Sequence, residues 1–109
     1  MALFYDWGFF IQPGRDEEFR SWLSTHDEQL FELAPRHYQY LGTYRPLAAA
    51  DPCDYHQLWR YAADRTPDLR IAAGDADGAF TRLAQEYLSF VDAAREPEET
   101  FNLYGEVPS

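Results

Sequence analysis

Four stretches of the chain alternate large apolar or aromatic side chains with a second set of residues. Successive side chains on a β-strand point to opposite faces, so this alternation predicts strands. Pro and Gly residues at the ends of these stretches mark turns and limit their length. The predicted strands cover Leu3 to Gln12, His37 to Arg45, Asp54 to Tyr61 and Thr100 to Val107.

The third predicted strand has no plainly solvent-facing side. Its odd-numbered positions carry Tyr55, Gln57, Trp59 and Tyr61, and its even-numbered positions carry His56, Leu58 and Arg60. Both faces thus hold aromatic or hydrogen-bonding groups. We expect something to cover each of them, with helices on one side and a second copy of the chain on the other.

Two other segments have helical spacing. The first begins with the acidic run at 16–18, where the helix macrodipole favours negative charge, and ends at Pro35. The second takes Asp75 or Asp77 as its N-cap and stops before Pro97. Its apolar stripe consists of Phe80, Leu83, Tyr87, Phe90, Val91 and Ala94. Between the third strand and this helix, a short helix is expected around 68–73.

The predicted order is strand, helix, strand, strand, helix, strand over a single domain of residues 1–109. This order is that of the α+β ferredoxin-like fold, in which two helices cover one face of a four-stranded antiparallel sheet. The other face is bare in a monomer and would carry several large aromatic side chains. Monomers rarely expose so much apolar area, so we expect a homodimer formed through an isologous two-fold contact.

Several short motifs strengthen this expectation. They are Pro13-Gly14 after the first strand, Phe19 and Trp22 in the first helix, Leu41-Gly42-Thr43-Tyr44, and Gln57-Leu58-Trp59-Arg60-Tyr61. Together they resemble NIPSNAP-like and antibiotic-biosynthesis-monooxygenase-like members of the dimeric α/β-barrel superfamily, in which a histidine often stands where this chain has Gln57. The resemblance implies two sheets that face each other and close a small barrel. Relatives include monooxygenases without metal or cofactor, haem-degrading enzymes, muconolactone-type isomerases and members of no known activity.

The resemblance also implies which strand faces point into the barrel. On that basis the pocket or dimer interface would be lined by Tyr5, Trp7, Tyr40, Tyr44, Gln57, Trp59 and Tyr61. The helices would then pack on Phe4, Phe10, Leu41, Leu58 and Tyr104. The alternative is an ionic site, in which Asp6, Arg45, His56 and Arg60 face the cavity instead of the aromatic set.

Charge and composition exclude several classes of function. The formal net charge is −10, which disfavours nucleic acid and acidic membrane surfaces as partners. All nine cationic residues are Arg, so a lysine Schiff base is impossible. The one cysteine, Cys53, lies near two acids that disfavour its thiolate. The N-terminus has no signal-peptide pattern and no apolar run could span a membrane, so we expect a cytoplasmic protein.

No local motif fixes a chemistry. The histidines at 26, 37 and 56 have no zinc-binding spacing, and the run at 75–78 resembles a helix start better than a calcium loop, so no metal or cofactor is predicted. Three hypotheses remain. The first is a homodimeric enzyme that oxygenates, isomerises or cyclises an aromatic or polyketide-like small molecule. The second is a non-catalytic dimeric module that binds a ligand or a protein. The third is haem binding through His56 or His37.

Overall fold

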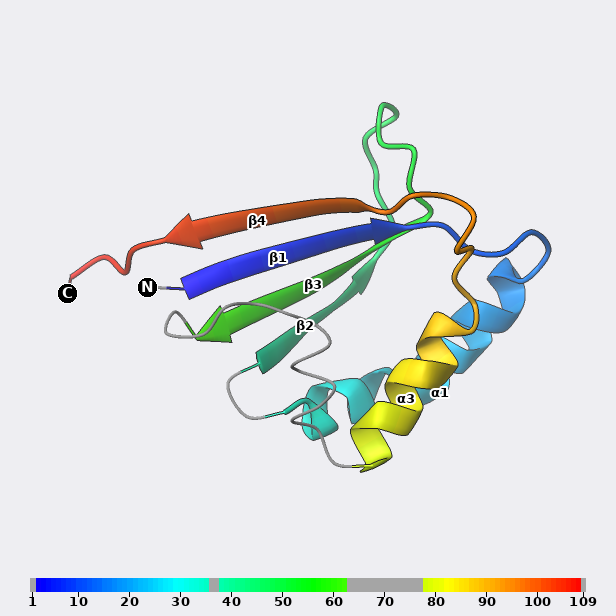
Figure 1. The fold of residues 1–109 in the computed structure, drawn as a ribbon, viewed down its shortest axis with the longest axis horizontal. Coiled ribbons are helices and arrows are strands. Elements are labelled where there is room, and N and C mark those ends of the chain that lie inside the picture. The colour runs from blue at the N-terminus through cyan, green and yellow to red at the C-terminus, as the bar shows by residue number, and fades with distance from the viewer. Residues whose placement is uncertain (1, 36–37, 63–77, 109) are drawn as a thin grey trace.

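The fold is a single antiparallel sheet with its helices gathered on one side. The computed structural model describes residues 2–35, 38–62 and 78–108. The elements are β1 (Ala2–Phe9), α1 (Asp16–Leu33), β2 (Tyr38–Tyr44), β3 (Tyr55–Ala62), α3 (Gly78–Leu88) and β4 (Glu98–Tyr104). The sheet has the order β2-β3-β1-β4, and α1 and α3 lie side by side against it (Figure 1). The predicted α+β ferredoxin-like arrangement is therefore confirmed.

The second helix ends earlier than its apolar stripe predicted. It stops at Leu88 rather than near Ala94, and Val91 forms a β-bridge with Ile11. The Gln12 amide also donates to the Phe90 carbonyl at 2.9 Å. Residues 90–91 thus pair with residues 11–12, just after β1, and do not continue the helix. The last strand begins at Glu98, two residues before the predicted start, while the expected cap at 75 or 77 and the helix around 68–73 lie outside the described residues.

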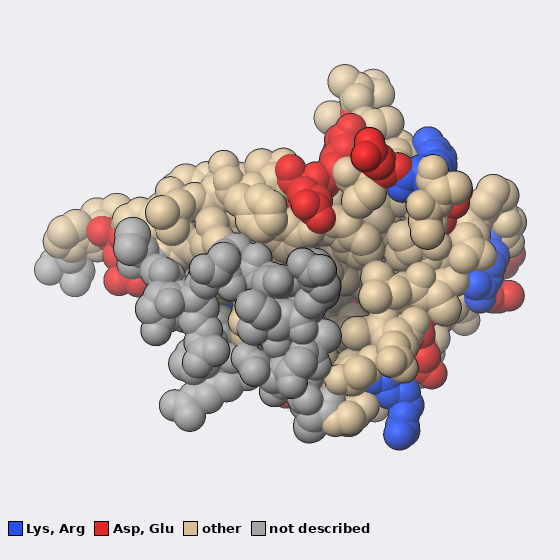
Figure 2. All heavy atoms as spheres, viewed as in Figure 1, with Lys and Arg blue, Asp and Glu red and all other residues tan. Residues whose placement is uncertain are grey.

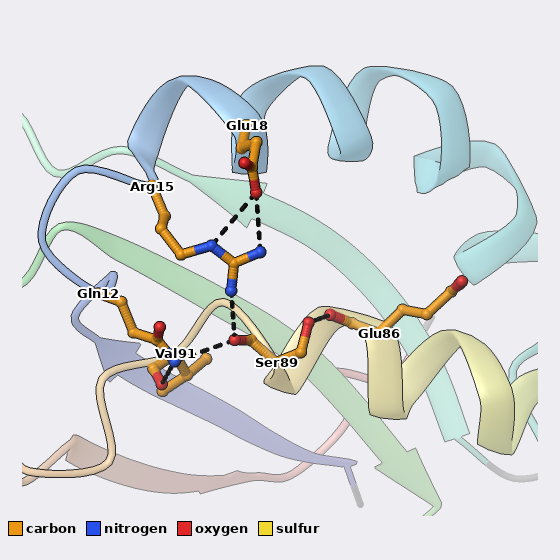
Figure 3. Close-up of polar contacts among 6 residues, drawn as sticks. All are labelled: Gln12, Arg15, Glu18, Glu86, Ser89 and Val91. Carbon is orange, nitrogen blue, oxygen red and sulfur yellow. Dashed lines mark hydrogen bonds and ion pairs between the residues drawn. The ribbon is translucent and has the colours of Figure 1, made fainter.

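One arginine ties the start of α1 to the end of α3 (Figure 3). The guanidinium of Arg15 donates to the Ser89 carbonyl at 2.9 Å and pairs with Glu18 at 2.8 Å. The side-chain amide of Gln12 donates to the same Ser89 carbonyl at 3.0 Å. A cation at a helix C-terminus satisfies carbonyls that have no partner within the helix. These contacts fix the two helices to each other at the end where both meet β1.

The core is an aromatic layer on the side of the sheet that the helices cover. It is made of Tyr5, Trp7, Phe9, Tyr38, Tyr40, Tyr55, Trp59 and Tyr61, all buried. From the helices, Phe19 contacts Phe9 and Tyr55, and Phe80 contacts Trp59 edge to face at 6.1 Å. Cross-strand register explains the layer, because Tyr5 pairs with Trp59 and therefore shares its face.

A bulge in β2 reverses the faces of its last residues. The register to β3 shifts between Tyr40 and Gly42, and Gly42 has a φ of 116°, a conformation that favours glycine. Thr43 consequently points towards the helices, where its hydroxyl lies 2.7 Å from the hydroxyls of Tyr40 and Tyr87. Tyr44 points the other way and is half exposed, with its ring against Gly42.

Candidate functional site

The prediction of which sheet face the helices cover was the wrong way round. Six of the seven residues expected at the barrel side belong to the helix-covered face: Tyr5, Trp7, Tyr40, Gln57, Trp59 and Tyr61. Of the residues expected under the helices, Leu58 lines a hollow on the opposite face, and Phe4 contacts Tyr104 there. The chain pattern could not decide this, since both faces carry large side chains.

Tyr44 is the seventh residue of that set, and it lies on the opposite face from the other six. Strict alternation predicted that Tyr44 would lie on the same face as Tyr40, because the two positions are four residues apart. The bulge at Gly42 breaks that alternation, and Tyr44 pairs with His56 in the register. A glycine between Leu41 and Thr43 in a predicted strand was the signal for such a bulge.

Most hydroxyls in the aromatic layer are satisfied within the protein. The Tyr40 hydroxyl donates to Asp27 at 2.8 Å, and the Tyr5 hydroxyl donates to Glu99 at 2.9 Å. The indole of Trp59 donates to Gln57 at 2.7 Å, so the glutamine where relatives often have histidine is a buried acceptor here. Burial is the main cause that raises the pKa of the Tyr5 and Tyr40 hydroxyls, so both stay protonated at neutral pH.

Two hydroxyls of the layer stand apart. Those of Tyr38 and Tyr61 are buried and have no hydrogen-bond partner among the described residues, and the same is true of the Trp22 indole nitrogen. Tyr38 and Tyr61 are cross-strand neighbours whose rings meet edge to face at 4.9 Å. Burial first, and then the neighbouring Tyr38, raise the pKa of Tyr61 above its ordinary value. Buried polar groups are nearly always satisfied, so these three atoms are exceptions within the described part of the fold.

The helix-free face carries a different set of groups around a hollow of about 250 Å³. The hollow lies where the loop between β2 and β3 projects away from the helices (Figure 1). Its lining combines charged side chains with apolar ones: Asp6, Tyr44, Arg45, Pro46, Leu47, Ala48, Asp51, His56 and Leu58. Acidic side chains also gather near the base of this loop, where β4 begins (Figure 2). The ionic alternative considered from the sequence therefore describes this face, with Asp6, Arg45 and His56 as its members.

His56 lies between two carboxylates at the edge of this hollow. Its Nδ1 lies 2.5 Å from Asp6 Oδ1, and its Nε2 lies 2.6 Å from Asp51 Oδ2. Burial lowers the pKa of the imidazole, but hydrogen bonds and charges from Asp6 and Asp51 outweigh it, and the pKa is raised overall. Both ring nitrogens of His56 thus contact carboxylates, and His37, the other histidine considered for haem, lies outside the described residues.

Cys53 completes this group, which we call the His56 cluster (Asp6, Asp51, Cys53 and His56). The Cys53 amide donates to Asp51 Oδ1 at 2.9 Å, an Asx turn across Pro52 that also lowers the pKa of Asp51. Burial, and then the charges of Glu98 and Asp51, raise the pKa of the Cys53 thiol to about 11. The expectation that this thiol is no nucleophile agrees with that environment. Sequence spacing alone could not find the cluster, because Asp6 comes from β1.

Comparison with known proteins identifies the fold. No protein-family model matches the chain, and no curated protein matches it. Among solved structures, a NIPSNAP family protein from Agrobacterium tumefaciens has a TM-score of 0.64 at 11% identity, covering 98% of this chain and 89% of that one. A proposed antibiotic biosynthesis monooxygenase from Bordetella bronchiseptica has a TM-score of 0.61 at 18% identity, covering 96% and 98%. An uncharacterized NIPSNAP domain protein from Burkholderia xenovorans has a TM-score of 0.60 at 12% identity and covers both chains fully.

The chain therefore has the ferredoxin-like fold of NIPSNAP and antibiotic-biosynthesis-monooxygenase-like proteins, as the short motifs indicated. At these identities the likeness establishes the fold and leaves the activity open. Neither described helix is both long and apolar enough to cross a bilayer.

Proposed function

We propose that this chain forms a homodimer that binds a flat aromatic or apolar small molecule against the helix-covered face of the sheet. The observation that carries the proposal is the pair of buried hydroxyls on Tyr38 and Tyr61, for which the described part of the chain supplies no partner. Aromatic surface with a few convergent polar groups is typical of small-molecule sites. The groups that would contact the ligand are those expected from the sequence, above all Trp59 and Tyr61. The ligand would lie on the helix-covered side of the sheet and not on the barrel side.

The geometry around these hydroxyls favours a planar ligand with one polar oxygen. The rings of Trp59 and Tyr61 are nearly parallel, with an angle of 20° and centroids 6.3 Å apart. Because burial keeps Tyr61 as a neutral phenol, its hydroxyl would donate a hydrogen bond to a carbonyl or phenolate oxygen. A neutral phenol orients such a group and can protonate it, but it does not act as a base at neutral pH.

For the reaction, we propose cofactor-independent oxygenation, or isomerisation or cyclisation, of an aromatic or polyketide-like compound. Support comes from the shared fold of the Bordetella bronchiseptica protein and from the phenol donors at one end of the aromatic layer. The second candidate is binding without catalysis. It is favoured by the hydroxyls of Tyr5 and Tyr40, which are already bonded to acids of the chain itself.

The homodimer is proposed through the helix-free face. Phe4 and Leu58 lie on that face, and Tyr104, 56% exposed, extends it on β4. All seven residues of β4 are exposed in the single chain, and the even-numbered ones, such as Tyr104, share the face of Phe4, whereas Phe101 stacks on Tyr5 on the helix-covered side. Edge strands and apolar faces of this size are normally covered, and a second copy that packs by two-fold symmetry would cover both.

A ligand titration tests the proposed pocket. With 1-naphthol as the probe, tryptophan fluorescence should report binding, and Tyr61→Phe and Tyr38→Phe should each weaken it about tenfold, the value of one hydrogen bond. Tyr55→Phe is the matched control, because its hydroxyl already bonds Asp16 and Arg20. Equal affinity in all four proteins would remove the pocket from this face.

Two further measurements separate the finer proposals. Oxygen uptake with a dihydroxynaphthalene as the probe would support oxygenation, whereas binding without product formation supports the non-catalytic module. Light scattering coupled to size exclusion should give a dimer at micromolar concentration. A clean monomer there would contradict the dimer and leave the pocket to be judged by the titration.

A further inference from the structure

The His56 cluster brings three different metal-binding side chains together on the helix-free face. One ligand atom each from Asp51, Cys53 and His56 lie within 4.8 Å of one another. All three come from the loop before β3 and the start of that strand, in the spacing Asp-x-Cys-x-x-His. None of them has a role in the aromatic pocket proposed above, which lies on the other face.

We propose that Asp51, Cys53 and His56 bind a divalent transition-metal ion of the zinc type, with Asp6 orienting the histidine. The donor set decides the class of ion. A thiolate together with an imidazole suits Zn²⁺ or Co²⁺, whereas Mg²⁺ and Ca²⁺ take oxygen ligands only. The sequence prediction of no metal site considered the spacing of the histidines and the run at 75–78, and did not weigh this mixed set.

The hydrogen bonds of the cluster already have the arrangement that a metal site needs. Asp6 Oδ1 lies 2.5 Å from His56 Nδ1, so this carboxylate can keep a proton on Nδ1 while an ion replaces the proton that Nε2 shares with Asp51. Metal-bound histidines commonly donate their other ring N–H to a carboxylate in this way. His56 Nε2 and Asp51 Oδ2 are now 2.6 Å apart, and two ligands of a tetrahedral zinc ion are separated by about 3.3 Å. An increase of less than about 1 Å in the distance between these two atoms would therefore admit the ion in place of the proton that they now share.

Gly8 on β1 is what lets the thiol and the imidazole lie together against the sheet. A Cβ at Gly8 would stand 2.7 Å from Cys53 Sγ and 2.8 Å from His56 Cε1, closer than real Cβ atoms approach. Gly8 pairs with His56 in the register, so this backbone contact is fixed by the sheet itself. The glycine offers a steric test of the site that alters no ligand atom.

The surroundings favour a cation and leave a route to it. The negative charge of Glu98 on β4 reaches the Cys53 thiol, and the whole chain carries a formal charge of −10. Asp51 lines both the hollow around His56 and a second hollow of about 450 Å³ that Cys53 also lines. Three protein ligands at such a boundary leave a fourth coordination position for water, as in zinc sites that are open to a ligand.

Cobalt titration of the full chain under reducing conditions tests this site directly. The protein is first treated with a chelator, and Co²⁺ is then added while the spectrum is recorded. We expect one equivalent of Co²⁺ to produce thiolate-to-cobalt charge-transfer absorption in the near ultraviolet, and Zn²⁺ to abolish it by competition. Mg²⁺ should not compete. No charge-transfer band at saturating Co²⁺ would overturn the proposal.

Variants assign the ligands. Cys53→Ser should lose the charge-transfer band, His56→Gln should lose tight binding, and Asp6→Asn should weaken binding about 10- to 100-fold, as loss of an orienting carboxylate does elsewhere. Gly8→Ala should also weaken binding, although it removes no ligand. His26→Gln is the control, because that imidazole bonds only the Trp22 carbonyl within its own helix. Circular dichroism of each variant verifies folding, and wild-type affinity in folded Cys53→Ser and Asp6→Asn would overturn the assignment.

The proposed metal site does not depend on the proposed function. The three ligands and the orienting carboxylate belong to one chain, so the metal titration can succeed whether or not the protein dimerises. Binding of 1-naphthol and its loss in Tyr61→Phe concern the opposite face. Failure of either experiment therefore leaves the other proposal standing.

Discussion

The two faces of the sheet differ in how their polar groups are handled. On the helix-covered face, polar atoms are buried among rings, and the sheet meets a second layer of side chains from Phe19 and Phe80. On the helix-free face, charged groups meet at short distances around His56, beside apolar side chains such as Phe4 and Leu58 that stay partly exposed in the single chain. The first face therefore supplies most of the stability, while the second is available for a partner chain and an ion.

The largest expected difference between the faces concerns two adjacent residues of β3. Trp59→Ala removes a buried indole and leaves the Gln57 acceptor without its donor, so it should lower the free energy of unfolding by about 4 kcal/mol. Leu58→Ala, on the helix-free face, should cost about 1 kcal/mol or less in the single chain. Urea denaturation of both variants gives the comparison. Equal losses would mean that the faces are not organised as described.

The second expected effect concerns the association of two chains. Leu58→Glu places a carboxylate beside Asp6 and Asp51 on the face proposed to be shared by two copies. Like charges brought together at an interface cost several kcal/mol, so the Kd of the dimer should rise at least about 100-fold. Light scattering over a dilution series measures this change. Leu88→Glu, at the exposed end of α3, is the control and should leave the dimer intact.

The sequence predicted the order of elements because each element depends on local signals. The acidic first turn and Pro35 bracket α1, and alternation located all four strands to within a few residues. Those signals are carried by neighbouring residues, and tertiary contacts did not override them. The exception is the end of α3, where pairing of Val91 with Ile11, a partner distant in the chain, replaced the last predicted turn.

The faces and the cluster could not be predicted, for two physical reasons. The family resemblance implied that Tyr5 and Trp59 share a face, but alternation does not tell which face the helices cover when both faces carry large apolar side chains. The His56 cluster depends on register, because the pairing of β1 with β3 brings Asp6 to His56 over fifty positions of chain. The glycine bulge at 42 adds a reversal that strict alternation cannot express.

The third expected effect tests that bulge. Gly42→Ala forces a side chain into a φ of 116° and brings its Cβ within 3.0 Å of the Tyr44 ring, so it should destabilise the protein by about 2 kcal/mol. Gly14→Ala is the matched control, since Gly14 also has a positive φ of 82° but no atom within 4 Å of the added Cβ. It should cost about 1 kcal/mol, from backbone conformation alone. Thermal unfolding of the two variants separates the strain of the bulge from the clash with Tyr44.

The smallest expected effect compares two hydroxyls of the aromatic layer. Tyr40→Phe removes a hydroxyl that bonds Asp27 and Thr43, and should lower the free energy of unfolding by about 1.5 kcal/mol. Tyr61→Phe removes a hydroxyl that has no partner in the ranges 2–35, 38–62 and 78–108, and should leave stability unchanged or slightly raised. Both tyrosines are about equally buried, so packing does not distinguish them. If Tyr61→Phe were as destabilising as Tyr40→Phe, the hydroxyl would have a structural partner, and the pocket would lose its main support.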